Sequence, residues 1–106
     1  MGMKPVTLKT IADVTGGKLV GGGEDTLITG VVRDNREVKD GFLFVCFPGA
    51  RVDGHDFAPD AFSKGAAACL AQRELSDAAG PYILVEDTLT ALKELAKSWQ
   101  SITEAF

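Results

Sequence analysis

The sequence of 106 residues has the length of one compact domain and is too short for a nucleotide-driven multidomain enzyme. Its 45% hydrophobic and 25% charged residues are typical of a globular protein with a real core, which excludes a disordered or fibrous chain. The 11 Lys and Arg residues against 15 Asp and Glu give a net charge of −4, and the basic residues are scattered. We therefore expect no nucleic-acid partner.

The pattern of cysteines and apolar runs argues against disulfides, a metal site and a membrane span. Cys46 lies in the run FLFVCF and Cys69 in AAACLA, which predicts two buried, reduced thiols and no disulfide. No Cys-x-x-Cys pair is present, so we expect no metal site. The N-terminus has no apolar leader region, and no apolar run approaches the ~20 residues that cross a bilayer. These features predict a cytoplasmic protein without a membrane partner.

The first third of the chain predicts a helix, a turn and two strands. An amphipathic helix is expected over residues 8–15, with Gly16 as its stop. Residues 18–20 predict a brief strand, followed by a flexible turn at Gly21–Gly23. This glycine run is not interpreted as a phosphate loop because no Lys-Ser/Thr pair follows it. Residues 27–33 (LITGVVR) predict one strand of β-branched character.

The middle of the chain predicts three apolar strands and one helix. The run 42–47 (FLFVCF) is typical of a strand buried on both faces, which we expect at the centre of the sheet. A helix beginning near Asp56 follows, with Phe57 on its core-facing side, because Pro59 is tolerated only in a first helical turn. Two further short core strands are expected over 66–71 and 82–85.

The last segment predicts a helix that Asp87 or Thr88 caps. Its expected apolar stripe consists of Leu89, Leu92, Leu95, Ala96, Trp99 and Ile102. The strand–helix–strand order in the middle of the chain requires a right-handed crossover on a parallel or mixed sheet. The predicted fold class is therefore α/β, a single domain with a mixed or mainly parallel sheet flanked by helices.

Polar loops follow two of the predicted strands, at the edge where open α/β sheets bind ligands. Arginines and backbone amides of such loops can hold a pyrophosphate, and carboxamide and carboxylate groups can hold a nucleoside. The candidate binding residues are Asp34, Asn35, Arg36, Gly49, Arg51, Asp53, Gly54 and His55. The alternative is purely structural: a solvated turn at Arg36, a turn carboxylate at Asp53 and a packing role for His55.

Two segments of these loops carry a family resemblance. The stretch DNREVKDGFLFV has the pattern D-x-R-x-x-x-x-G-x-L-F-V from Asp34 to Val45, and the loop DGHDF follows from Asp53 to Phe57. In this order, together with the opening TLKTIADVTGGKLVGG, they resemble the N-terminal domain of the bacterial Mur ligases over nearly the whole chain. Asn35 departs from the family pattern, which usually has Ser between the aspartate and the arginine.

The resemblance implies that residues 1–86 bind the UDP end of a UDP-N-acetylmuramyl peptide. Residues 87–106 would then form a helix that packs on this domain and leads toward an ATPase domain elsewhere in the same chain. In that parent enzyme, ATP and Mg²⁺ would serve to phosphorylate the peptide carboxylate, which an incoming amine attacks to form the amide bond. The sequence contains no G-x-x-x-x-G-K-[ST] motif, so we expect these 106 residues to need no cofactor and to be inactive alone.

Three functional alternatives remain open. The opening IADVTGGKLVGG favours the family members that add D-alanyl-D-alanine to the muramyl tripeptide. The second alternative is the preceding ligase, which adds the third amino acid. The third is a stand-alone regulatory or interaction module, because one α/β fold can host unrelated functions.

Overall fold

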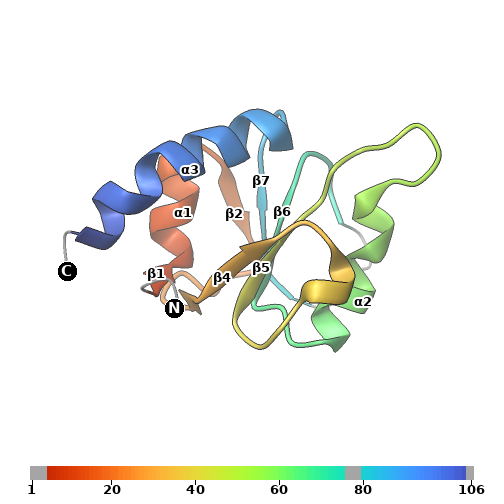
Figure 1. Ribbon diagram of the computed structural model, residues 1–106, viewed down its shortest axis with the longest axis horizontal. Helices are drawn as coiled ribbons and strands as arrows, with labels where there is room; N and C mark the ends of the chain where they lie inside the picture. The colour runs from red at the N-terminus through yellow and green to blue at the C-terminus, as the bar shows by residue number, and fades with distance from the viewer. Residues whose placement is uncertain (1–4, 76–79, 105–106) are drawn as a thin grey trace.

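The computed structural model describes residues 5–75 and 80–104. The strands are β1 (Val6–Thr7), β2 (Lys18–Val20), β3 (Leu27–Ile28), β4 (Gly30–Val32), β5 (Phe42–Val45), β6 (Ala68–Ala71) and β7 (Tyr82–Leu84). The helices are α1 (Leu8–Thr15), α2 (Ala58–Ser63) and α3 (Thr88–Glu104), and two 3₁₀ turns span Asn35–Glu37 and Gly54–Phe57. Helices α1 and α3 lie on one side of the main sheet and α2 on the other (Figure 1).

The main sheet has five strands in the order β2-β7-β6-β5-β4. Strands β4 to β7 pair in parallel, whereas β2 pairs antiparallel with β7, which confirms the predicted mixed sheet. The middle position belongs to β6. Strand β5 is an inner strand between β4 and β6, not the central one that the apolar run 42–47 predicts. Burial on both faces is common to all inner strands, so an apolar run alone does not distinguish among them.

Successive residues of the inner strands enter two cores on opposite faces of the sheet. In β5, Leu43 and Val45 pack with α1 and α3, whereas Phe44 packs with α2. The same alternation assigns Cys46 and Cys69 to the α2 side, where both are buried and free. The predicted buried thiols are confirmed among the described residues.

The predicted strand over 27–33 is wrong in one respect, because the chain changes sheets within it. Residues Leu27 and Ile28 pair with β1 in a two-stranded antiparallel sheet, and Gly30 begins β4 of the main sheet. Thr29 lies between them, and its N–H donates to Gly41 O at 3.0 Å. A Cβ at Gly30 would lie 2.6 Å from the ring of Phe42, so any other residue where β4 meets β5 would displace that ring.

The helices differ from their predicted positions at particular residues. Helix α2 begins at Ala58 rather than near Asp56, and Phe57 belongs to the preceding 3₁₀ turn, 37% exposed rather than on a core-facing side. In α3, Leu89 and Ala96 are exposed, which corrects the predicted stripe. The other predicted members are confirmed, because Leu95 is buried in the core with α1 and Leu92 and Trp99 pack against that core, which Ala91 also joins. The side chain of Ile102 lies outside the described residues.

Helices α1 and α3 each begin at a side chain that caps the helix. Thr7 Oγ1 accepts the N–H of Thr10 at the start of α1, and Gly16 ends that helix with a φ of 70°. Asp87 caps α3, because its carboxylate accepts both the N–H and the hydroxyl of Thr90. In the part of the chain that the structure describes, no helix is long and apolar enough to cross a bilayer.

Candidate functional site

The two predicted loops meet at the carboxyl ends of β4 and β5 and enclose a pocket of about 360 Å³. Its wall combines apolar side chains with an arginine, a carboxylate and a carboxamide. The lining residues are Arg33, Asp34, Asn35, Phe44, Phe47, Val52, Gly54 and Phe57. Val52 is 60% exposed and Phe57 37%, so two large apolar side chains remain accessible at this pocket. Such a combination suits a ligand with a flat ring and polar edges.

Asp34 organises the loop after β4. Its Oδ1 accepts the backbone N–H of Arg36 at 2.9 Å and caps the 3₁₀ turn, and its carboxylate binds the Arg36 guanidinium through Nε and Nη2. The hydrogen bonds from Arg36 lower the pKa of Asp34 to about 2, and Asp34 in turn raises the pKa of Arg36. The arginine side chain remains 83% exposed, with Nη1 engaged by no described residue.

Asn35 connects the same loop to α2. Its Nδ2 donates to Asp60 Oδ2 at 2.7 Å, and Lys64 Nζ lies 2.9 Å from the same carboxylate oxygen. Lys64 also donates to the backbone oxygen of Asn35. The predicted contact residue Asn35 is therefore held from the side of α2 while it lines the pocket.

Two predicted glycines close the loop after β5. The N–H of Gly54 donates to Phe47 O at 2.7 Å, which joins the two ends of the loop. A Cβ at Gly54 would lie 2.8 Å from backbone atoms of Phe47, and a Cβ at Gly49 would collide with the carbonyl oxygen of Val52. Both glycines are required by close backbone approach, which gives them a structural role whatever the loop binds.

His55 is buried, with both ring nitrogens engaged inside the protein. Its Nδ1 lies 2.6 Å from Asp53 Oδ1, and its Nε2 accepts the backbone N–H of Gln72 at 3.0 Å. Because Nε2 accepts, Nδ1 carries the proton and donates to Asp53. His55 therefore positions the loop from behind and offers no free ring nitrogen to a ligand in this arrangement.

The hydrogen bonds continue from Gln72 to the start of α3. Gln72 Oε1 accepts the backbone N–H and the hydroxyl of Thr88, each at 3.0 Å, and Thr88 is fully buried. A chain of hydrogen bonds thus runs from Asp53 through His55 and Gln72 to Thr88, and it links the loop after β5, the end of β6 and the last helix.

Asp53 also has a partner that is not part of this series of hydrogen bonds. Its Oδ2 accepts from Arg73 Nε at 3.2 Å, and Arg73 Nη2 reaches Asp56. The N–H groups of His55, backbone first and ring second, lower the pKa of Asp53 to about 2. Asp53 is therefore ionised at neutral pH, and its two oxygens accept hydrogen bonds that hold the loop in place.

Of the predicted site residues, Asp34, Asn35 and Gly54 line the pocket. Arg36, Gly49, Arg51, Asp53 and His55 belong to the same two loops but are not among its lining residues. The apolar wall is not evident from the sequence, because Phe47 ends an apolar run that is typical of a strand and Val52 is a lone apolar residue in a polar loop. The part of Asp60 is not evident either, because a link between positions 25 residues apart depends on the tertiary structure.

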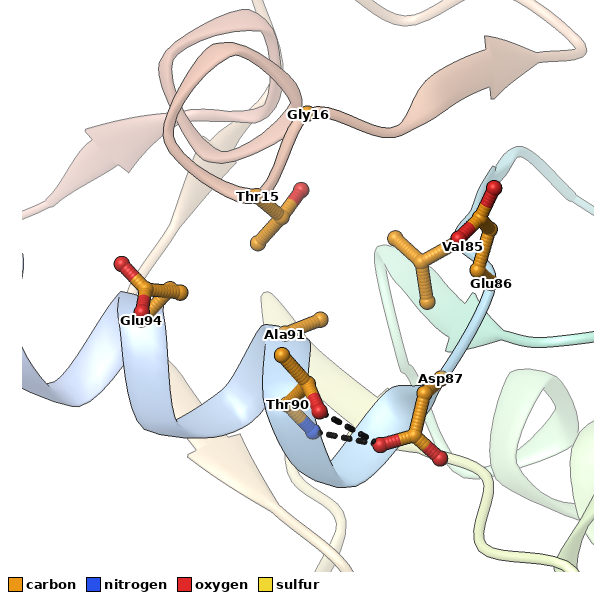
Figure 2. A pocket seen from close by; sticks show the side chains of 8 residues that line it. All are labelled: Thr15, Gly16, Val85, Glu86, Asp87, Thr90, Ala91 and Glu94. Carbon is orange, nitrogen blue, oxygen red and sulfur yellow. Dashed lines mark hydrogen bonds between the residues drawn. The ribbon is translucent and has the colours of Figure 1, made fainter.

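A second pocket of about 320 Å³ lies between the end of α1 and the start of α3 (Figure 2). Three carboxylates line it, from Glu86, Asp87 and Glu94, and Figure 2 shows Asp87 bonded to Thr90. Carboxylates repel an anion, so this pocket is a poor candidate for a phosphorylated ligand. Across residues 5–75 and 80–104, no three or more His, Cys, Asp or Glu side chains, these carboxylates included, are grouped so that they could hold a metal ion.

Comparison with known proteins identifies the family. Residues 27–100 match the model of the Mur ligase family, catalytic domain. The chain is 50% identical over 78 residues to the UDP-N-acetylmuramoyl-L-alanyl-D-glutamate–2,6-diaminopimelate ligase of Bacillus licheniformis. This alignment covers 74% of the present chain and 16% of the ligase. The chain is 42% identical over 96 residues to the UDP-N-acetylmuramoyl-tripeptide–D-alanyl-D-alanine ligase of Bacillus subtilis, covering 88% of this chain and 21% of that protein.

The fold of the chain is also similar to that of a Mur ligase of known structure. The crystal structure of MurF from Acinetobacter baumannii superposes with a TM-score of 0.80 at 26% identity and covers 90% of this chain and 21% of that one. The chain thus spans about a fifth of the length of the proteins it matches. The matched segment contains the pocket, both loops and all strands of the main sheet from β4 to β7. The chain belongs to the Mur ligase family.

Proposed function

We propose that this domain anchors the UDP end of a UDP-N-acetylmuramyl peptide in the pocket between the two loops. The supporting observation is the composition of the pocket, which is lined both by the aromatic side chains of Phe47 and Phe57 and by the polar side chains of Asp34 and Asn35. An aromatic wall accommodates the face of a nucleobase, and polar groups at the rim bind its edge and the ribose.

The arginines at the pocket supply the charge that a diphosphate requires. Arg33 lines the pocket, and Arg36 presents the outer edge of its guanidinium to solvent. Arginine binds phosphate through paired N–H groups, and the ion pair with Asp34 keeps the Arg36 side chain in one orientation. Arg51, exposed in the second loop, is a further candidate for this contact.

The amide-bond chemistry belongs to other parts of a longer protein. The sequence has no phosphate-loop motif, and no group of three or more His, Cys, Asp or Glu among the described residues could hold a metal ion. We propose that further domains of the same chain supply the sites for ATP and Mg²⁺, as in an ATP-dependent ligase of peptidoglycan synthesis acting in the cytoplasm. These 106 residues would then bind substrate without turning it over.

The leading assignment is the ligase that adds D-alanyl-D-alanine. It is supported by a relative of that name that aligns over 88% of the chain, and by the MurF structure that covers 90% of it. The second candidate is the ligase that adds diaminopimelate, which is favoured by the higher identity of 50% over a shorter segment. An assay of the full gene product with D-alanyl-D-alanine and with diaminopimelate, each with its own muramyl peptide, distinguishes the two.

The binding proposal is tested by NMR titration of the ¹⁵N-labelled chain with UDP and with UDP-N-acetylmuramic acid. We expect a dissociation constant on the order of a millimolar, because one domain contacts only one end of a long substrate. Amide shifts should concentrate in residues 33–36 and 47–57. Arg36→Ala should weaken binding, and Lys93→Ala, an exposed position on α3, should leave it unchanged. Shifts confined to Gly21–Gly23, or none at saturating UDP, would contradict the proposal.

A further inference from the structure

The side-chain amide of Asn35 lies between α2 and the pocket. Its Nδ2 donates to Asp60 Oδ2 at 2.7 Å, and Asp60 belongs to the first turn of α2. Asn35 is at the same time a lining residue of the pocket, whereas Asp60 is not. One end of the amide, Nδ2, is therefore bound to α2, on a residue that also lines the pocket.

The chemistry of Asp60 fixes which end of the amide faces α2. A carboxylate only accepts hydrogen bonds, so it must meet Nδ2 and not Oδ1 of Asn35. The hydrogen bonds from Asn35 and Lys64 lower the pKa of Asp60, which keeps this carboxyl ionised at neutral pH. The reversed amide would place two oxygens against each other at this position. The orientation of the Asn35 amide therefore follows from the chemistry of Asp60, which requires a donor at this position.

The other end of the amide is an open acceptor. No described residue donates a hydrogen bond to Asn35 Oδ1, and no unpaired polar side-chain atom of the described residues is buried. Oδ1 is therefore not fully buried, and it belongs to a residue that lines the pocket. A ligand that reaches the Asn35 amide therefore meets a hydrogen-bond acceptor, Oδ1, and not the NH₂ group.

We propose that Asp60 is a positioning residue that orients Asn35, so that Asn35 Oδ1 selects a base with an N–H at its Watson–Crick edge. Uracil has a donor at N3, whereas cytosine has an acceptor there, so the same pose of cytosine would place a lone pair against Oδ1. This inference rests on the proposed UDP site and specifies how that site tells uracil from cytosine. Recognition by a matched donor and rejection of an acceptor is how polar sites discriminate between ligands of similar shape.

The test compares the dissociation constants of UDP and CDP in NMR titrations of the chain and four variants. The unmodified chain should bind UDP about tenfold more tightly than CDP, as expected when one hydrogen bond is replaced by an unpaired acceptor. Asp60→Ala frees the amide to rotate and should reduce this ratio to within about twofold. Asn35→Ala removes the amide and should do the same, independently of any effect on α2.

Two variants separate orientation from charge. Asp60→Asn can keep an oxygen where Lys64 Nζ and Asn35 Nδ2 both require one, so it should retain the preference for UDP. Lys64→Met removes the ion pair but leaves the bond between Asn35 and Asp60, and it should also retain the preference. Circular dichroism verifies that each variant is folded.

The outcomes are distinguishable from a failure of the proposed function. If UDP binds in the two loops but the preference is absent, or survives in Asp60→Ala or Asn35→Ala, the positioning role is overturned and the UDP site stands. Loss of the preference for UDP in Asp60→Asn or Lys64→Met would also overturn the positioning role. The preference would then depend on charge and not on the orientation of the Asn35 amide. If UDP does not bind at all, the proposed function itself fails.

Discussion

His55 Nε2 accepts a hydrogen bond from the backbone N–H of Gln72 at 3.0 Å, which ties the loop after β5 to the end of β6. The other ring nitrogen faces Asp53 at 2.6 Å, so the imidazole is a neutral cross-link with its proton on Nδ1. Because this loop forms part of the pocket, the cross-link holds one wall of the candidate binding site in place before any ligand arrives.

Replacing His55 by Ala should destabilise the domain by about 2 kcal/mol. The change leaves the half-buried backbone N–H of Gln72 without its acceptor and opens a void at a side chain that is only 1% exposed. Urea unfolding measures the difference. The control is Arg51→Ala in the same loop, where the side chain is exposed and the effect should stay within about 0.5 kcal/mol. Equal stabilities of the two variants would contradict the cross-link.

Acid should remove the contribution of Asp53 to stability. Its pKa is about 2 in the folded protein against an ordinary value of 3.8, because the N–H groups of His55 bind the charged form. A lowered pKa stabilises the folded state fully above the ordinary value, and this contribution disappears as the pH falls from about 4 through about 2. The difference in unfolding free energy between the unmodified chain and Asp53→Asn should therefore shrink over this range. A difference that is independent of pH would show that the charge of Asp53 has no part in it.

Gly49→Ala should distort the loop after β5. The added Cβ would collide with the carbonyl oxygen of Val52, which is backbone and cannot move aside alone. We expect a loss of at least ~1 kcal/mol in unfolding free energy and weaker binding of UDP, since Val52 lines the pocket. The neighbouring exposed Ala50 provides the control, because Ala50→Ser should change neither quantity. A Gly49→Ala variant that matches this control would show that the loop adapts without strain.

Two leucines of α3 should respond differently to truncation. Leu95 is 1% exposed within the core shared with α1, whereas Leu89 is 48% exposed. Leu95→Ala should lower the unfolding free energy by about 2 to 5 kcal/mol, and Leu89→Ala by less than about 0.5 kcal/mol. Denaturant unfolding of both variants measures this difference. The opposite order would mean that the last helix is rotated about its axis.

Helix α3 also bears on the proposed division of the chain at residues 86 and 87. Ala91 and Leu95 lie in one buried cluster with α1 and the sheet, so the helix and the segment before it share a core. The assignment of 1–86 to substrate binding and 87–106 to a helix that leads to a further domain remains a prediction about the longer protein.

Local patterns were sufficient to predict most elements. Apolar runs, glycine stops and capping residues act over a few positions, so the helix over 8–15 and the strands around 42–47 and 82–85 were predicted near their observed bounds. The two polar loops were also evident from the sequence, because polar residues directly after parallel strands lie at one edge of the sheet. The family resemblance rests on these same loops and is confirmed by the family match over residues 27–100.

Only the tertiary structure decided how distant segments meet. The separation of Ile28 from Gly30 into two sheets depends on pairing with β1 and β5, which no local pattern contains. Leu89 and Leu95 are the same residue type on one helix, and only packing against α1 and the sheet determines which of them is buried.

The same holds for the chemistry of the loops. His55 and Asn35 are polar residues that suit either a ligand or the protein itself, and the choice follows from partners that the fold brings near. Gln72 occupies one ring nitrogen of His55, and Asp60 holds the amide nitrogen of Asn35. The sequence determined which residues carry hydrogen-bonding groups in the two loops. The fold decided which of those groups remain open to a ligand, because burial requires partners for polar atoms and those partners lie 17 and 25 positions away.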